Sequence, residues 1–101
     1  MTKLQVKELI KRIAIEYGVD PDKAVKVAEK ESSLNPNCVH KNNDRRKTTD
    51  RGLFQINSFW HSEIPDKCCY NPECATRFFC KRVKQGFAKE WYGARGIFYY
   101  K

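Results

Sequence analysis

One glutamate of this chain ends an apolar face of a predicted helix, a place where a carboxyl group can do acid chemistry. Glu31 continues a stripe of apolar residues at helical spacing, formed by Ala24, Val27 and Ala28. Partial removal from water disfavours the charged carboxylate, so we expect a raised pKa for Glu31. A carboxyl group that keeps its proton near neutral pH can serve as a general acid. The alternative is a structural role for Glu31, in an ion pair with an arginine or at the rim of the core.

Five cysteines are the second chemical feature. Disulfides are favoured over a metal site, because the CxxC pairs of structural zinc are absent and His61 would be a ligand at an unusual spacing. Cys74 can close a short loop back to Cys68 or Cys69, which are predicted to lie in a polar loop, and Cys38 can bridge to another of the group. Because the number of cysteines is odd, one thiol is left without a disulfide partner. The disulfide candidates are Cys38, Cys68, Cys69, Cys74 and Cys80; no metal and no cofactor is predicted.

Two helices are predicted to position Glu31. Apolar residues recur at helical spacing from about Thr2 onward, and Gly18 is placed to end this first helix. Asp20 is a good N-cap for a second helix, with Pro21 at its first position. This second helix carries Glu31 near its end.

The rest of the chain is predicted to hold a polar excursion and two further helices. Residues 37–50 are polar and basic, which is typical of an exposed turn region at the tip of a small β-hairpin. Asn71 and Pro72 start a helix that Gly86 stops, and the aromatic tail predicts a short helix near 88–94. The sequence therefore predicts an α+β, mainly α chain with a small central β-hairpin, as a single domain over residues 1–101.

Two short motifs connect the region of Glu31 with the middle of the chain. The first reads E-S-x-x-N-P and the second G-L-x-Q-I, at residues 31–36 and 52–56. In this order and at this separation they resemble the lytic transglycosylase (SLT) domain of the lysozyme superfamily. The stretch TTDRGLFQINS is also similar to animal-type lysozymes, which carry an acidic residue at the place of Asp50. The close matches cover residues 24–60.

The resemblance implies a lysozyme-like fold and cleavage of the β-1,4 bond between N-acetylmuramic acid and N-acetylglucosamine in bacterial peptidoglycan. Glu31 matches the family's catalytic glutamate, which protonates the glycosidic oxygen. Asp50 matches the second carboxylate of animal-type lysozymes, the proteins in which this two-carboxylate chemistry is best known. Gln55 matches a glutamine of the cleft floor that positions the sugar. Asn57 and Phe54 are candidate sugar contacts, with ordinary packing as the alternative.

The chain also departs from the transglycosylase pattern. His40 stands where a serine is common, nine residues after the glutamate, and the resemblance places it near the site as a candidate substrate contact. Cys38 stands where the family usually has a small alanine. In the C-terminal signature Trp91 and Ala94 fit, but the expected tyrosine falls on Phe98.

Two reactions stay open. A transglycosylase uses one glutamate as acid and then base, and the sugar's own 6-hydroxyl closes an anhydro ring. A hydrolase delivers water instead, usually with a second carboxylate. Asp50 favours hydrolysis if its side chain reaches the cleft, and it is otherwise a turn residue or a partner of Arg51. The motifs lean slightly toward the transglycosylase.

The composition of the chain limits the classes of partner that it is expected to bind. The chain has 101 residues with 20 Lys and Arg and 12 Asp and Glu, a net charge of +8 that suits an anionic polymer such as the bacterial wall. Motifs of nucleic-acid binding and membrane-length apolar runs are absent, so neither nucleic acid nor a transmembrane segment is predicted.

The expected setting follows from these partners. We expect a monomer that acts outside the cell or in the cell envelope. No signal peptide is recognised at Met1, which fits a phage lysin or a domain of a longer exported protein. The alternative function is a noncatalytic basic module that binds cell-wall glycan.

Overall fold

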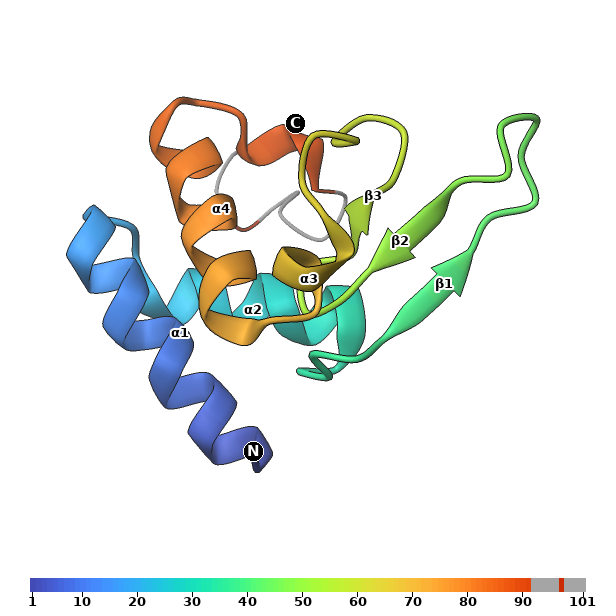
Figure 1. Ribbon diagram of the computed structural model, residues 1–101. Helices are drawn as coiled ribbons and strands as arrows, with labels where there is room; N and C mark the ends of the chain where they lie inside the picture. The colour runs from blue at the N-terminus through green and yellow to red at the C-terminus, as the bar shows by residue number, and fades with distance from the viewer. Residues whose placement is uncertain (92–96, 98–101) are drawn as a thin grey trace.

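The computed structural model describes residues 1–91 and residue 97 (Figure 1). A group of helices packs beside a three-stranded antiparallel sheet of order β1-β2-β3. The predicted mainly helical α+β class is confirmed, and the predicted hairpin is two strands of this sheet. In chain order the elements are α1 (Lys3–Tyr17), α2 (Pro21–Ser32), β1 (Val39–Lys41), β2 (Thr49–Arg51), β3 (Ile56–Asn57), α3 (Asp66–Cys69), α4 (Pro72–Lys84) and the 3-10 helix η1 (Ala88–Glu90).

The ends of the long helices follow from local capping. The hydroxyl of Thr2 accepts the first hydrogen bond of α1, and Gly18 ends this helix in the left-handed conformation at φ 71°. Asp20 and Asn71 cap α2 and α4 through their side-chain oxygens, and a proline follows each of them. The predicted starts of α2 and α4 are therefore confirmed.

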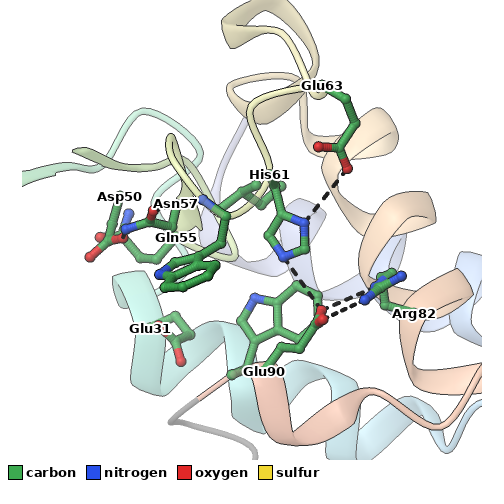
Figure 2. A pocket seen from close by; sticks show the side chains of 11 residues that line it. Glu31, Asp50, Gln55, Asn57, His61, Glu63, Arg82 and Glu90 are labelled. Atoms are coloured by element: carbon green, nitrogen blue, oxygen red, sulfur yellow. Dashed lines mark hydrogen bonds and ion pairs between the residues drawn. The ribbon is translucent and has the colours of Figure 1, made fainter. Parts of the chain in front are cut away.

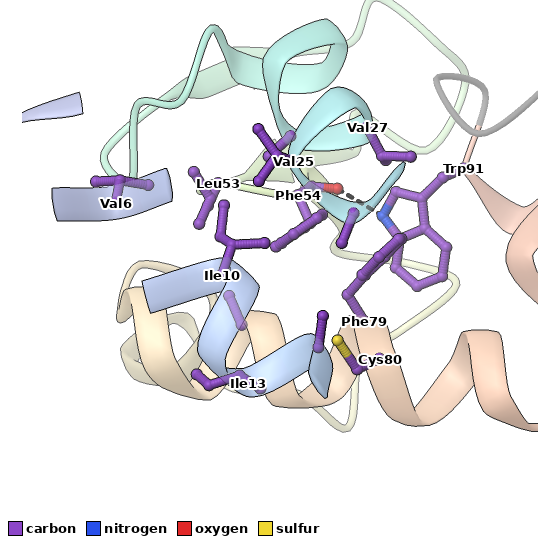
Figure 3. Packing of buried hydrophobic residues seen from close by; sticks show 14 of the residues in the cluster. Val6, Ile10, Ile13, Val25, Val27, Leu53, Phe54, Phe79, Cys80 and Trp91 are labelled. Atoms are coloured by element: carbon purple, nitrogen blue, oxygen red, sulfur yellow. Dashed lines mark hydrogen bonds between the residues drawn. The ribbon is translucent and has the colours of Figure 1, made fainter. Parts of the chain in front are cut away.

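An aromatic stack forms the centre of the core between α1, α2 and α4 (Figure 3). The rings of Phe54 and Phe79 stack at a centroid distance of 4.3 Å, and Trp91 meets Phe79 edge-on at 4.9 Å. The indole Nε1 of Trp91 donates a hydrogen bond of 2.6 Å to the Phe54 carbonyl. Burial of each phenyl ring contributes about 2 kcal/mol, so this stack holds the C-terminal part of the described chain against the middle.

Two predicted regions differ from the structure. Cys68 and Cys69, predicted in a polar loop, lie in the short helix α3, where their N–H groups donate to the Pro65 carbonyl. The helix predicted near 88–94 begins as the 3-10 helix η1, and its residues 92–94 lie outside the described part of the chain.

One disulfide, between Cys68 and Cys74, joins α3 to the first turn of α4. The thiols of Cys38, Cys69 and Cys80 are free. The bridge expected for Cys38 is therefore a difference from the structure, because Cys68 and Cys74 bond each other while Cys69 and Cys80 are fully buried. Burial raises the pKa of Cys80 to about 12, so this thiol stays protonated and unreactive.

The helices of the described residues do not include one that is both long and apolar enough to span a membrane.

Candidate active site

A cleft of about 580 Å³ lies between the end of α2, the sheet, the loop after β3 and η1 (Figure 2). Four of the six side chains predicted for a site line it, namely Glu31, Asp50, Gln55 and Asn57. In Figure 2 Glu31 comes from α2, whereas Asp50 and Asn57 come from the sheet across from it. The cleft therefore brings two carboxyl groups from different elements to one space.

The end of α2 fixes the position of Glu31, which is half-buried. The hydroxyl of the next residue, Ser32, donates hydrogen bonds to the carbonyls of Leu53 at 2.8 Å and of Ala28 at 3.2 Å. Ser33 then ends the helix in the left-handed conformation at φ 56°. Because Ser32 joins the helix end to the segment between β2 and β3, Glu31 is held at a set place relative to the sheet.

Two amides hold the carboxylate of Asp50. Asn57 Nδ2 donates to Asp50 Oδ1 at 2.9 Å, and Asn42 Nδ2 donates to Oδ2 at 3.1 Å. The same two amides also donate to Thr48 Oγ1, at 3.2 Å and 3.0 Å. Both oxygens of Asp50 are thus oriented, one by Asn57 of β3 and the other by Asn42 just after β1, and the side chain faces the cleft with little freedom to rotate.

The pairing of Asp50 with Arg51, considered above as an alternative, is not formed. Neighbouring residues of a strand point to opposite faces of the sheet. Arg51 is buried on the other face, where its guanidinium bonds Asp66 Oδ1 at 2.8 Å and the carbonyls of Ile56 and Ile64 at 3.1 Å and 3.0 Å. Arg51 therefore ties the sheet to the loop after β3 and to α3.

The amides of Gln55 and Asn57 are bound to the main chain around the cleft. Gln55 has a left-handed backbone at φ 51°, and its Nε2 donates to the carbonyls of Gly52 at 2.8 Å and Cys38 at 3.2 Å. Asn57 Oδ1 accepts from the N–H groups of Phe59 and Trp60 at 2.9 Å and 3.2 Å. Gln55 thereby holds the floor of the cleft, and Asn57 sets the start of the loop that carries Trp60.

Two other predicted contacts do not line the cleft. Phe54 is fully buried and stacks on Phe79, so the ring has no surface for a sugar, and we correct the expectation of a sugar contact. His40 lies on the exposed strand β1, directly opposite Asp50 in the pairing of β1 with β2. It shares a sheet face with Asp50 but stays outside the cleft lining.

A charged cluster forms a wall of the cleft that the sequence did not suggest. Glu90 Oε1 accepts from Arg82 Nε at 3.0 Å, and Arg82 Nη2 contacts the second oxygen. His61 lies between two carboxylates, 3.4 Å from Glu90 and 3.7 Å from Glu63. The hydrogen bonds that Arg82 donates to Glu90 raise the pKa of the Arg82 guanidinium. This cluster joins η1, α4 and the loop after β3, as the dashed lines in Figure 2 show.

Two tryptophans also line the cleft and were not predicted as contacts. The side chain of Trp60 is 71% exposed, whereas Trp91 is 4% exposed and stacks on His61 at a centroid distance of 6.3 Å. An exposed indole face can pack on the C–H face of a sugar ring. The available signal was the aromatic pair Phe59-Trp60, which begins three residues after the end of the second motif.

The described residues contain no group of three or more His, Cys, Asp or Glu side chains that could hold a metal ion. The family model described as a lysozyme-like domain matches residues 11–92 of the chain. No curated protein matches the chain. The matched range contains all the cleft residues named above.

Proposed function

The chain belongs to the lysozyme-like domain family, and from this premise we propose that it hydrolyses the β-1,4 glycosidic bond between N-acetylmuramic acid and N-acetylglucosamine in bacterial peptidoglycan. Membership of the family supports glycosidase chemistry of the muramidase type on peptidoglycan. The single observation that carries the finer proposal is that Glu31 and Asp50 line the same cleft. We propose that the protein acts on the cell wall, outside the cell or in the envelope.

Each carboxyl group has a separate role in this proposal. Glu31 donates its proton to the glycosidic oxygen, so the leaving sugar departs as an alcohol. Asp50 stabilises or traps the oxocarbenium-like centre with its carboxylate, and water then adds at the anomeric carbon and returns a proton to Glu31. Gln55 and Asn57 hold the surrounding main chain, and Trp60 offers an apolar face to a sugar.

The position of Asp50 supports hydrolysis over transglycosylation. The motifs of the sequence lean toward the transglycosylase, which needs one carboxyl group. A second carboxylate that lines the cleft and is oriented by two amides is the arrangement that a hydrolase uses. We therefore favour the hydrolase, with the transglycosylase as the second candidate.

Mass spectrometry of the muropeptides released from purified walls tests this choice. Hydrolysis adds one water across the bond, so we expect products with reducing ends. Products with 1,6-anhydro ends, one water lighter, would contradict hydrolysis but keep glycan cleavage. If the chain sediments with the wall and releases no fragment at any pH, the noncatalytic binding module is the correct function.

The variant Asp50→Asn should lower the rate of cleavage by about 10²-fold, the typical loss when one electrostatic contact to the transition state is removed. The amide is neutral, and it keeps the size of the carboxylate. The rate is measured by the increase in reducing ends. The control is Asp22→Asn, which removes an exposed carboxylate 3.6 Å from Lys11 and should leave the rate unchanged. Equal rates for Asp50→Asn and wild type would remove Asp50 from the mechanism.

A further inference from the structure

The tip of the β1–β2 hairpin is a basic surface that the proposed cleavage does not use. The hairpin projects from the helical part of the molecule in Figure 1. Its exposed cationic side chains, called the basic tip below, are Lys41, Arg45, Arg46 and Lys47. Within the described residues, none of the four makes an ion pair. Their charge is therefore available to an anionic partner.

Asp44, the acidic residue of the loop between β1 and β2, holds the conformation of this loop. Asp44 Oδ1 accepts from the N–H of Thr48 at 2.9 Å, and its Oδ2 accepts from the Thr48 hydroxyl at 2.6 Å. These hydrogen bonds hold the pKa of Asp44 below its usual value. Thr48 in turn accepts from the amides that orient Asp50. The loop conformation is thus fixed by the network that reaches the cleft.

A chain of contacts leads from the basic tip to the cleft. The guanidinium carbon of Arg46 lies 4.2 Å from the centroid of the Phe59 ring. Phe59 meets the Trp60 ring edge-on at 4.9 Å, and Trp60 lines the cleft. A polymer that leaves the cleft over Trp60 therefore reaches the basic tip next.

The charge of the cleft is opposite to that of the tip. Among the described residues, four carboxyl groups line the cleft, those of Glu31, Asp50, Glu63 and Glu90, against one guanidinium, that of Arg82. Anionic groups on a substrate are repelled by such a lining and attracted by clustered cations. The sugars and the anionic groups of one substrate can thus occupy neighbouring surfaces.

We propose that the basic tip binds the carboxylates of the stem peptides on the glycan strand whose sugars occupy the cleft. This inference rests on the proposed function, because it takes peptidoglycan as the substrate. The stem peptides are carried by the same polymer as the scissile bond, so the contact sequence from cleft to tip favours them over a separate partner. The basic tip then gives preference for strands that still carry peptides.

The test compares dissociation constants for soluble glycan strands with and without stem peptides. All proteins carry Glu31→Gln, so that binding is measured without cleavage. Adding Arg45→Gln and Arg46→Gln should weaken binding of peptide-bearing strands by about 5- to 10-fold, the sum of two exposed ion pairs. Binding of peptide-free strands should not change. Added salt should reduce the difference between the two strands.

The matched control adds Lys3→Gln and Arg12→Gln, which remove the same charge from exposed positions of α1. This control should retain the preference for peptide-bearing strands. An equal loss of affinity for both kinds of strand would overturn the inference. So would full retention of the preference in the tip variant. Cleavage by the chain without Glu31→Gln is measured in parallel. If it is absent while the binding preference depends on the tip, the proposed function fails and the inference stands.

Discussion

The variant Glu31→Gln should lose glycan cleavage by about 10²- to 10⁴-fold, the range that a general acid contributes. The amide of glutamine matches the carboxyl group in size, but it has no proton that it can transfer to a glycosidic oxygen. Because Glu31 is half-buried at the end of α2, the substitution should change the rate and leave the fold intact. The measurement is the initial rate of clearing of a purified wall suspension.

The matched control for this experiment is Glu29→Gln on the same helix. Glu29 is exposed, and its carboxylate lies 3.7 Å from the Lys7 ammonium, an ion pair worth little at the surface. We expect wild-type clearing from this variant. Thermal unfolding of both variants should occur near the wild-type midpoint. If Glu31→Gln clears walls as fast as Glu29→Gln does, Glu31 is not the acid and the proposed mechanism is wrong.

The helices were predictable because their signals are local. Asp20 and Asn71, each followed by proline, start α2 and α4 as expected, and Gly18 ends α1. The strand β3 and the helix α3 have two and four residues, too short for a period to be recognised in the sequence. Arg51 holds both elements through the carbonyls of Ile56 in β3 and Ile64 just before α3, and such contacts leave no periodic pattern in the sequence.

The residues of the site could be predicted from the sequence where they lie in short motifs. Glu31 and Gln55 were found through the two motifs and Asp50 through the stretch TTDRGLFQINS, and all three line the cleft. The string G-L-F-Q-I does not tell which side chain turns inward, so a sugar contact and ordinary packing both stayed open for Phe54, which belongs to the core. His61 and its partners were missed, because a cluster built from three separate segments leaves no local spacing.

The substitution Gly52→Ala should destabilise the protein by about 2–5 kcal/mol. The backbone at Gly52 is left-handed at φ 79°, which alone costs an L-residue about 1–2 kcal/mol. In addition, an added Cβ would lie 1.8 Å from the carbonyl oxygen of Cys69 and 3.3 Å from that of Pro36. Both atoms are main chain, so relief requires α3 or the loop after α2 to move, and such overpacking costs about 1–3 kcal/mol or more. Urea unfolding measures the loss, which is a large part of a typical total stability of about 5–15 kcal/mol.

The control Gly86→Ala separates the two causes. Gly86 also has a left-handed backbone, at φ 93°, but an added Cβ there has no atom within 4 Å. It should therefore cost only the backbone part, about 1–2 kcal/mol. Gly52 N–H donates to the Cys38 carbonyl, and the Gly52 carbonyl accepts from Gln55 Nε2. A displacement of residue 52 should therefore also disturb the cleft floor, so that even the folded molecules of Gly52→Ala cleave glycan more slowly. Equal free energies of unfolding for the two variants would mean that α3 moves away from residue 52 at little cost. The close approach of Gly52 to Cys69 would then not fix the shape of the cleft.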